Sequence, residues 1–437
     1  MTLKFKYFSL IAILCWSLSG FAQNNRKEKK ILKAVDKHVE NAISLLKTSV
    51  SINSGTMNFE GVKAVGQLFQ KEFDALGFTT TLTSGEAYGR AGHLIAKTTG
   101  KKGPKVLLIG HLDTVFELES PFQAYTMQND SIMKGPGVAD MKGGDVIIIL
   151  AMQALRDAGL LDDMSIEIIM TGDEEKSGRP LSLSKKDLID AAKRSDIAIG
   201  FENGDNNPKT IVVSRRGSTD WKLTVKGKPA HSSQVFTETV GVGAIFETSR
   251  ILNAFYEQLS TEKDLTFNPG FILGGTDIEG NASGTGGEAL GKTNVVAQEA
   301  TVRGDLRAVS LKQLEHAKRV MQEIVSEHYP KTSAELIFSD GGYPPLSLTE
   351  GNQKLLGYYN TVSEDLGFGS VEAVNPRKAG AADISFTSGY VDMAIDGLGL
   401  TGGGGDHTIN ETGNLNTIAT QAKITAVLLY RLVHSKF

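Results

Sequence analysis

The chain has 437 residues, of which 40% are hydrophobic and 22% charged, a composition typical of a folded protein long enough for two domains. Its formal net charge at pH 7 is −4, so it has no excess of basic residues with which to bind a nucleic-acid backbone. These figures argue against an intrinsically disordered chain and against nucleic acid as a partner.

The N-terminal residues have the pattern of an export signal. Lys4 and Lys6 precede an apolar run, residues 8–16, which gives way to small and then polar residues. This order predicts a signal peptide over residues 1–22, cleaved after Ala22, and therefore a periplasmic or secreted protein. The apolar run is short for a membrane span, so no membrane association is expected after cleavage.

The single cysteine, Cys15, lies inside this predicted signal. A lipid anchor on Cys15 is the less favoured alternative, because the bulky residues Leu14 and Trp16 flank it. After cleavage the mature chain would contain no cysteine, which excludes disulfides and thiolate ligands. Any metal ion would have to be bound by histidine, aspartate and glutamate.

The first half of the chain alternates between helical and strand-like patterns. Apolar residues recur at helical spacing over residues 31–46 and 62–76. Short apolar runs then alternate with a further helical pattern, in the order 106–109, 145–158 (helical), 166–170 and 197–201. Alternation of this kind predicts an α/β fold with a mostly parallel sheet covered by helices.

The pattern changes after residue 215. Strand and helix patterns follow in the order strand-helix-strand-strand-helix-strand, at residues 221–225, 242–259, 265–273, 294–306, 310–328 and 334–338. This is the ferredoxin-like order. We therefore predict an inserted α+β domain over residues 216–339, within a catalytic domain formed by 23–215 and 340–437. The glycine-rich segment 270–291 is predicted to be a mobile loop or a long hairpin tip, with a substrate-covering role as the alternative.

Ionisable side chains follow the apolar runs at 106–109, 166–170 and 197–201, and a fourth run at 393–395, where each predicted strand ends. In an open α/β sheet, ligands bind beyond the carboxyl ends of the strands, so we expect these side chains to converge. A further carboxylate, Asp140, lies in a glycine-bracketed turn before the predicted helix at 145–158. Taken alone, Asp140 would be interpreted as a helix cap. The candidate residues are His111, Asp113, Asp140, Glu174, Glu175, Glu202 and His407.

Local spacing suggests separate roles for two pairs of neighbours. In an extended chain residues two apart point the same way, so Asp113 is expected to accept the second imidazole N–H of His111 and orient the ring. Glu174 and Glu175 would face opposite ways, which leaves one to bind metal and the other to act as a base. Without the neighbouring pattern, both would be interpreted as solvated surface glutamates.

Several motifs together resemble those of the M20 metallopeptidases, a family that includes glutamate carboxypeptidases, aminoacylases, desuccinylases and dipeptidases. The motifs are HLDTV at 111–115, GPGVADMKGG at 135–144, TGDEE at 171–175, FE at 201–202, GKPAH at 227–231 and HTINE at 407–411. The resemblance covers essentially the whole mature chain. It implies a zinc-exopeptidase-like catalytic domain with an inserted ferredoxin-like dimerisation domain.

The resemblance also implies a two-metal site in which Asp140 bridges the ions. The other ligands would be His111 and Glu202 for one ion, and Glu175 and His407 for the other. Carboxylate and imidazole ligands suit Zn²⁺, with Mn²⁺ or Co²⁺ as alternatives. The implied reaction is amide hydrolysis, with Glu174 as the general base and a metal-bridging hydroxide as the nucleophile.

The inserted domain is expected, by the same resemblance, to form a homodimer and to bind substrate. His231 matches a histidine that reaches the partner's active site and stabilises the oxyanion. Asn294 and Arg307 match a pair that holds the substrate's terminal carboxylate. Arg377, in RKAGAAD at 377–383, resembles a substrate-facing position of the glutamate carboxypeptidase branch, with a surface arginine as the alternative.

The sequence therefore predicts an exported carboxypeptidase that acts on a small peptide or N-acyl amino acid, with glutamate as the candidate released residue. An aminoacylase (N-acyl amino acid deacylase) or a dipeptidase is the alternative within enzymes. A non-catalytic binding module that retains the fold is the alternative from another class. It is disfavoured because Glu174 and all five candidate ligands are present.

Overall fold

The computed structural model describes residues 4–98, 100–281 and 284–434, and the side chains from residue 26 onward. Of the predicted signal peptide, residues 1–3 lie outside the described part of the chain, and for residues 4–22 the side chains are not described. The chain divides into two compact units. The first consists of Met1–Val213, Thr349–Val374 and Gly389–Phe437, and the second of Ser214–Leu348 and Asn375–Ser388. The predicted insertion, 216–339, falls within the second unit.

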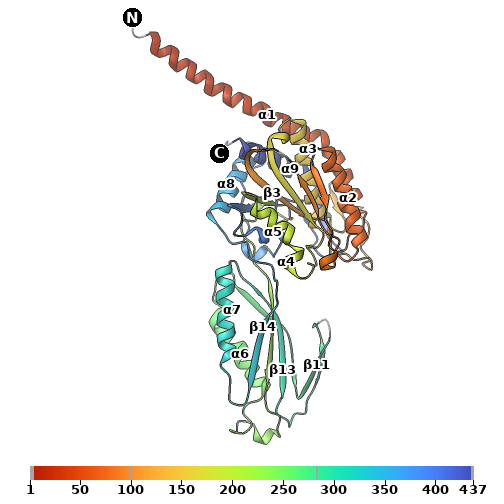
Figure 1. Cartoon of the computed structure of the whole chain (residues 1–437), viewed down its shortest axis with the longest axis vertical. Coiled ribbons are helices and arrows are strands. Elements are labelled where there is room, and N and C mark those ends of the chain that lie inside the picture. Colours follow the sequence, from red (N-terminus) through yellow and green to blue (C-terminus); the bar gives the residue numbers. More distant parts are fainter. Residues whose placement is uncertain (1–3, 99, 282–283, 435–437) are drawn as a thin grey trace. The chain divides into compact units, whose positions relative to one another are not determined.

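The first unit is built on a six-stranded sheet (Figure 1). Its strands, in spatial order, are β1 (Thr79–Leu82), β2 (Leu94–Lys97), β6 (Met164–Thr171), β3 (Lys102–His111), β7 (Ile197–Gly200) and β16 (Met393–Ile395). The four strands from β6 to β16 are parallel, whereas β1 and β2 pair antiparallel. Residues 106–111 of β3 are all buried, as expected for a strand covered on both faces. The predicted α/β class with a mostly parallel sheet is confirmed.

Helices cover this sheet through a continuous apolar core. Helix α3 (Gly143–Asp157) packs against α1 (Lys4–Val50) and α9 (Asn416–Val433), and α2 (Phe59–Ala75) packs against β1 and β2. Helix α8 (Glu350–Asp365) packs against β16. Among the described residues, no helix combines the length and apolarity that a membrane span requires.

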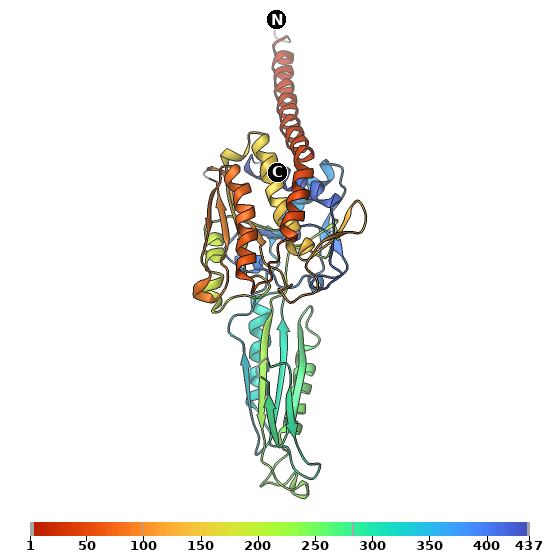
Figure 2. The same cartoon turned by 90° about the vertical axis from the view of Figure 1, so that its right-hand side faces the viewer.

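The second unit is a four-stranded antiparallel sheet with two helices. Its strands, in spatial order, are β10 (Thr266–Gly275), β13 (Glu299–Arg307), β9 (Thr219–Lys226) and β14 (Ser333–Phe338). Helices α6 (Ala244–Leu259) and α7 (Leu311–Ser326) enclose an apolar core with them, and Figure 2 shows the strands in front of these helices. The side chain of Ser310 accepts the N–H of Gln313 and caps α7.

The glycine-rich segment 270–291 continues β10 into a separate hairpin. Strands β11 (Asp277–Gly280) and β12 (Gly287–Leu290) pair antiparallel, with residues 282–283 outside the described part. The segment thus includes a hairpin, the second of its two predicted forms. Its substrate-covering role stays a prediction.

Candidate metal centre

The candidate ligands come from loops at one edge of the first unit's sheet. His111 is the last residue of β3, and Glu202 lies two residues beyond β7. Glu175 follows β6. Because these strands are parallel neighbours, their carboxyl ends meet at the same edge. Asp140 comes from a short helical turn, η2 (Val138–Lys142), before α3, and His407 from the loop between β17 (Gly402–Gly403) and β18 (Thr412–Asn414).

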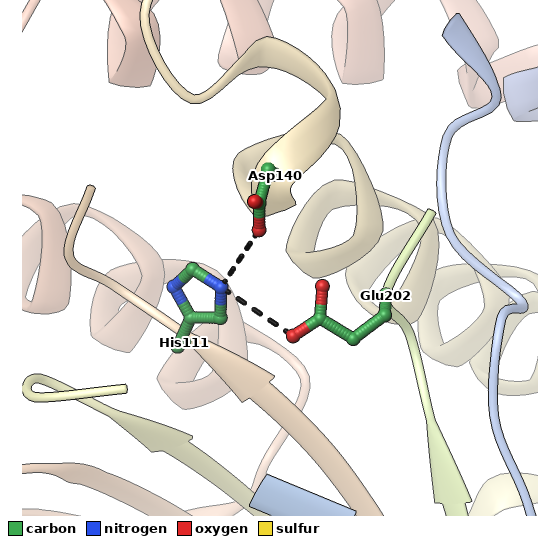
Figure 3. A group of neighbouring side chains, drawn as sticks. All are labelled: His111, Asp140 and Glu202. Carbon is green, nitrogen blue, oxygen red and sulfur yellow. Dashed lines mark hydrogen bonds and ion pairs between the residues drawn. The ribbon is translucent and has the colours of Figure 1, made fainter. Parts of the chain in front are cut away.

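Three of these residues form a first donor set (Figure 3). The Nε2 atom of His111 lies 3.1 Å from Oδ1 of Asp140 and 3.5 Å from Oε1 of Glu202. The donor atoms of the set all lie within 4.8 Å of one another. One imidazole nitrogen and two carboxylate oxygens at this spacing could all bind a single divalent cation.

A second donor set shares Asp140 with the first. The Nε2 atom of His407 lies 3.1 Å from Oδ2 of Asp140 and 3.1 Å from Oε2 of Glu175. The donor atoms again lie within 4.8 Å of one another. Each oxygen of Asp140 thus faces a different set, which is the geometry of a carboxylate that bridges two cations. The structure brings all five predicted ligands together in the two predicted groups.

The clustered carboxylates of the two donor sets favour a bound proton or cation at this site. Burial and the charge of Asp140 raise the pKa of Glu202 well above its usual value and that of Glu175 to about 7. Hydrogen bonding to Asp140 and Glu175 raises the pKa of His407 to about 11. Burial alone would raise the pKa of Asp140, but the two histidines outweigh burial and lower it. Crowded carboxylates of this kind can be neutralised by protons or by bound cations.

This electrostatic arrangement predicts that metal binding releases protons. At pH 7 the metal-free protein carries a proton on His407, because the imidazole pKa lies near 11, and Glu175 is partly protonated. A cation must displace these protons, so metal affinity should rise with pH by at least ~10-fold per unit between pH 6 and 8. Calorimetric titration in buffers of different ionisation enthalpy measures the released protons. A pH-independent affinity would contradict this prediction.

The group that accepts a hydrogen bond from the His111 ring differs from the predicted one. Its Nδ1 atom lies 3.0 Å from the backbone carbonyl oxygen of Asp113 and 3.5 Å from the Asp113 carboxylate. The nearer acceptor is therefore the backbone oxygen. Because a carbonyl only accepts hydrogen bonds, Nδ1 carries the N–H, and the lone pair of Nε2 can bind a metal ion.

The carboxylate of Asp113 instead holds the backbone that carries Glu174 and Glu175. Its Oδ1 accepts the N–H of Glu174 (3.1 Å), and its Oδ2 accepts the N–H of Glu175 (3.2 Å) and the hydroxyl of Thr56 (2.6 Å). Two successive N–H groups on one carboxylate require a bend, so the expectation of an extended chain at this point was wrong. Asp113 is thus a positioning residue for both glutamates.

Two further carboxylates, which were not among the predicted site residues, hold other ligand segments. Glu411, fully buried, accepts the N–H groups of Gly137, Ala139 and Asp140 at 2.9–3.2 Å. Asp396, also fully buried, accepts the N–H of Glu202 at 3.2 Å. Glu411 belongs to the HTINE motif and could have been singled out there. Asp396 follows β16, and nothing in its local pattern distinguishes it.

The candidate substrate residues lie in the second unit, and the structure separates two that were expected to act together. An antiparallel bridge joins His231 to Val295, which brings His231 beside Asn294. Arg307 is the last residue of the nine-residue strand β13 (Glu299–Arg307), whereas Asn294 lies five residues before its first residue. At ~3.3 Å per residue, the ends of this strand are roughly 25 Å apart. Within one chain, Asn294 and Arg307 therefore do not bind one carboxylate together.

Arg307 belongs instead to a cluster of arginines that the sequence did not predict. The pKa of Arg216 is lowered by burial and by the neighbouring charges of Arg307 and Arg377. Arg216 donates to Thr266 Oγ1 (2.9 Å) and to the backbone oxygen of Arg377 (3.3 Å), while its buried Nε has no partner among the described residues. The guanidinium of Arg307 is itself paired with Asp305 (Nε to Oδ2, 2.7 Å). The unused buried Nε of Arg216, beside the charges of Arg307 and Arg377, is a donor suited to an anion.

The sequence of the chain matches a known family over most of its length. The model of "Peptidase family M20/M25/M40" matches residues 107–431. The chain belongs to this family. It is therefore an M20-type metallopeptidase, and the resemblance inferred from its motifs is confirmed.

Individual relatives agree with this assignment. Carboxypeptidase G2 from Pseudomonas sp. (strain RS-16) is 25% identical over 397 residues, which cover 89% of this chain and 88% of the relative. Among solved structures, the aminopeptidase PepT of Bacillus cereus superposes with a TM-score of 0.69 at 19% identity, covering 90% and 98% of the two chains. A dinuclear metal-binding M20 peptidase of Bacillus subtilis gives 0.64 at 14% identity, covering 91% and 99%. These structures show that the fold is that of M20 peptidases.

Proposed function

We propose that this chain is a two-metal carboxypeptidase that hydrolyses the amide bond before a C-terminal amino acid. The observation that carries the proposal is the pair of donor sets sharing Asp140. Divalent ions bound there, with Zn²⁺ as the expected metal, would supply a polarised carbonyl and a water that ionises near neutral pH. The protein supplies the fixed ligand geometry through Asp113, Asp396 and Glu411.

Glu174 is the proposed general base. It would take a proton from the attacking water and deliver it to the leaving nitrogen. Two observations support this role. The backbone N–H of Glu174 is held by Asp113, and the charge of Glu174 contributes to the raised pKa of Glu202, so the two carboxylates lie close enough to interact.

We further propose that Arg307, Arg377 and Arg216 bind the carboxylates of an acidic C-terminal residue, for which glutamate is the candidate. Replacing Arg216 with Met should raise KM for a peptide ending in glutamate by ~10- to 100-fold, the effect of losing a charge-assisted hydrogen bond. The KM for the same peptide ending in alanine should change less. An exposed arginine, Arg319, provides the control as Arg319→Met. Equal changes for both peptides would contradict the proposed selectivity.

A panel of substrates tests the reaction class. It contains N-acyl amino acids, unblocked dipeptides and N-blocked peptides with C-terminal glutamate or alanine. The carboxypeptidase proposal requires cleavage of the N-blocked peptides, with glutamate released. Cleavage restricted to N-acyl amino acids would favour the aminoacylase alternative, and a requirement for a free N-terminus would favour a dipeptidase. No turnover of any compound by the metal-loaded protein would favour a binding module.

We propose that the chain acts as a homodimer in which His231 and Asn294 serve the partner's site. The separation of Asn294 from Arg307 supports this. Homodimers of His231→Ala and of Glu174→Gln should each be nearly inactive. After mixing with subunit exchange, activity should return to about one quarter of wild type, because half of the dimers are mixed and each has one intact site. Failure to recover activity in dimers shown to be mixed would contradict the arrangement.

Export is proposed from the sequence pattern of residues 1–22. N-terminal sequencing of the protein from cell fractions tests it. A periplasmic or secreted form beginning at Gln23 is expected, and a cytoplasmic form retaining Met1 would contradict export.

A further inference from the structure

The segment of residues 172–178, which carries Glu174 and Glu175, is fixed along most of its length by surrounding groups. Asp113 holds its middle, as described above. Contacts on either side are Gly172 N–H to His93 Nδ1 (3.2 Å), Arg90 to the carbonyl oxygens of Lys176 (2.6 Å) and Ser177 (3.2 Å), and Gly178 N–H to Asp173 Oδ2 (2.8 Å). Protein groups therefore hold the backbone of this segment along most of its length.

A buried ion pair lies directly before the two glutamates. The Nζ atom of Lys185 lies 3.0 Å from Oδ1 of Asp173 and 3.3 Å from its backbone carbonyl oxygen. Both side chains are fully buried. Lys185 lies at the junction of α4 (Leu181–Ser184) and α5 (Lys186–Lys193). One ammonium group thus binds both the side chain and the main chain of the residue that precedes Glu174.

Fold stability alone gives a weak reason for such a pair. Burying two charges is costly, and well-packed apolar residues of similar volume are often at least as stabilising. The ion pair also restricts the conformation of the turn that follows Asp173. Asp173 is held by Lys185 through one oxygen and joins Gly178 through the other, so both ends of the turn are tied together. From this turn, Glu175 reaches His407 with an oxygen–nitrogen distance of 3.1 Å.

We propose that Lys185 is a positioning residue of the metal centre. Through Asp173 it fixes the backbone from which Glu175 reaches the second donor set and Glu174 reaches the substrate. The part that concerns Glu174 rests on the proposed function. The part that concerns Glu175 requires only that the second donor set binds a metal ion.

The test compares Lys185→Met with Lys186→Met, which alters the adjacent, exposed lysine. In the metal-free protein, hydrogen exchange at the amides of Glu174 and Glu175 should be faster in Lys185→Met than in wild type. Affinity for Zn²⁺ and kcat should each fall by ~10- to 100-fold, the usual effect of removing a group that orients metal ligands. KM should change by less than about twofold, because substrate contacts are retained. Lys186→Met should behave as wild type in all four quantities: hydrogen exchange, Zn²⁺ affinity, kcat and KM.

The double variant Asp173→Asn/Lys185→Met separates positioning from folding. It leaves no uncompensated buried charge, so it should fold even where the single variant is destabilised. A purely structural role predicts that the double variant recovers wild-type metal affinity and exchange, whereas positioning predicts that the losses persist. Wild-type exchange and Zn²⁺ affinity in the folded double variant would overturn the proposal. Hydrogen exchange and Zn²⁺ affinity do not depend on which reaction the protein catalyses. They therefore test the positioning role of Lys185 even if Glu174 proves not to be the base.

Discussion

Replacing Glu174 with Gln should lower kcat by about a thousandfold or more while leaving both metal ions bound. General-base catalysis contributes ~10²–10⁴ to a rate, and glutamine cannot accept the proton. The substitution preserves side-chain length. It also preserves the backbone N–H that Asp113 holds, so the geometry of Glu175 is retained.

The measurements for this variant are kcat and metal content per chain. Glu60→Gln, at a side chain that is 88% exposed, makes the same chemical change on the surface and should leave both unchanged. A folded, metal-loaded Glu174→Gln protein with near-normal turnover would remove Glu174 as the base. Loss of metal together with activity would instead indicate a ligand role.

Replacing Asp140 with Asn should weaken the binding of both metal ions. Asp140 is the one residue common to the two donor sets, and the amide nitrogen of asparagine cannot bind a cation. The reduction should exceed the ~10- to 100-fold effect of changing residues that only orient ligands. Turnover at micromolar Zn²⁺ should fall to background.

The comparison variant is Glu202→Gln, which alters only the first donor set. Titration of the metal-free proteins with Zn²⁺ should show two weakened sites in Asp140→Asn and one in Glu202→Gln. If Asp140→Asn retained one site of wild-type affinity, Asp140 would not bridge two ions.

Much of the metal centre could be predicted because it depends on regular structure. The buried run before His111 identifies a strand, and parallel strands end at the same edge of a sheet. That rule brings His111, Glu175 and Glu202 together without coordinates. The same rule extends to His407, which follows the apolar run at 393–395 after a glycine-rich loop. The bridging role of Asp140 required the family resemblance, because a turn of irregular backbone carries it.

Other features depend on irregular backbone and could not be predicted. A two-residue spacing predicts that the Asp113 side chain lies beside His111, but the turn after β3 brings the backbone oxygen closer. The N–H groups that Asp396 and Glu411 accept belong to segments distant in the chain. Such contacts have no sequence period and no fixed spacing.

The second unit likewise combines features that the sequence predicts with features that it does not. Its strand and helix order follows from apolar patterns, as the confirmed fold class shows. The distance between Asn294 and Arg307 follows from the length of β13, and the predicted strand over 294–306 already implies it, although the family resemblance pairs the two residues. The arginine cluster forms because Arg377 lies in a segment, Asn375–Ser388, that joins this unit from a later part of the chain.

Anomalous diffraction from crystals of the protein grown with Zn²⁺ tests the central claim most directly. Two peaks are expected, one bonded to His111, Asp140 and Glu202 and the other to Asp140, Glu175 and His407, with zinc–ligand distances of about 2.0–2.2 Å. A single peak, or peaks that do not share Asp140, would contradict the two-metal centre.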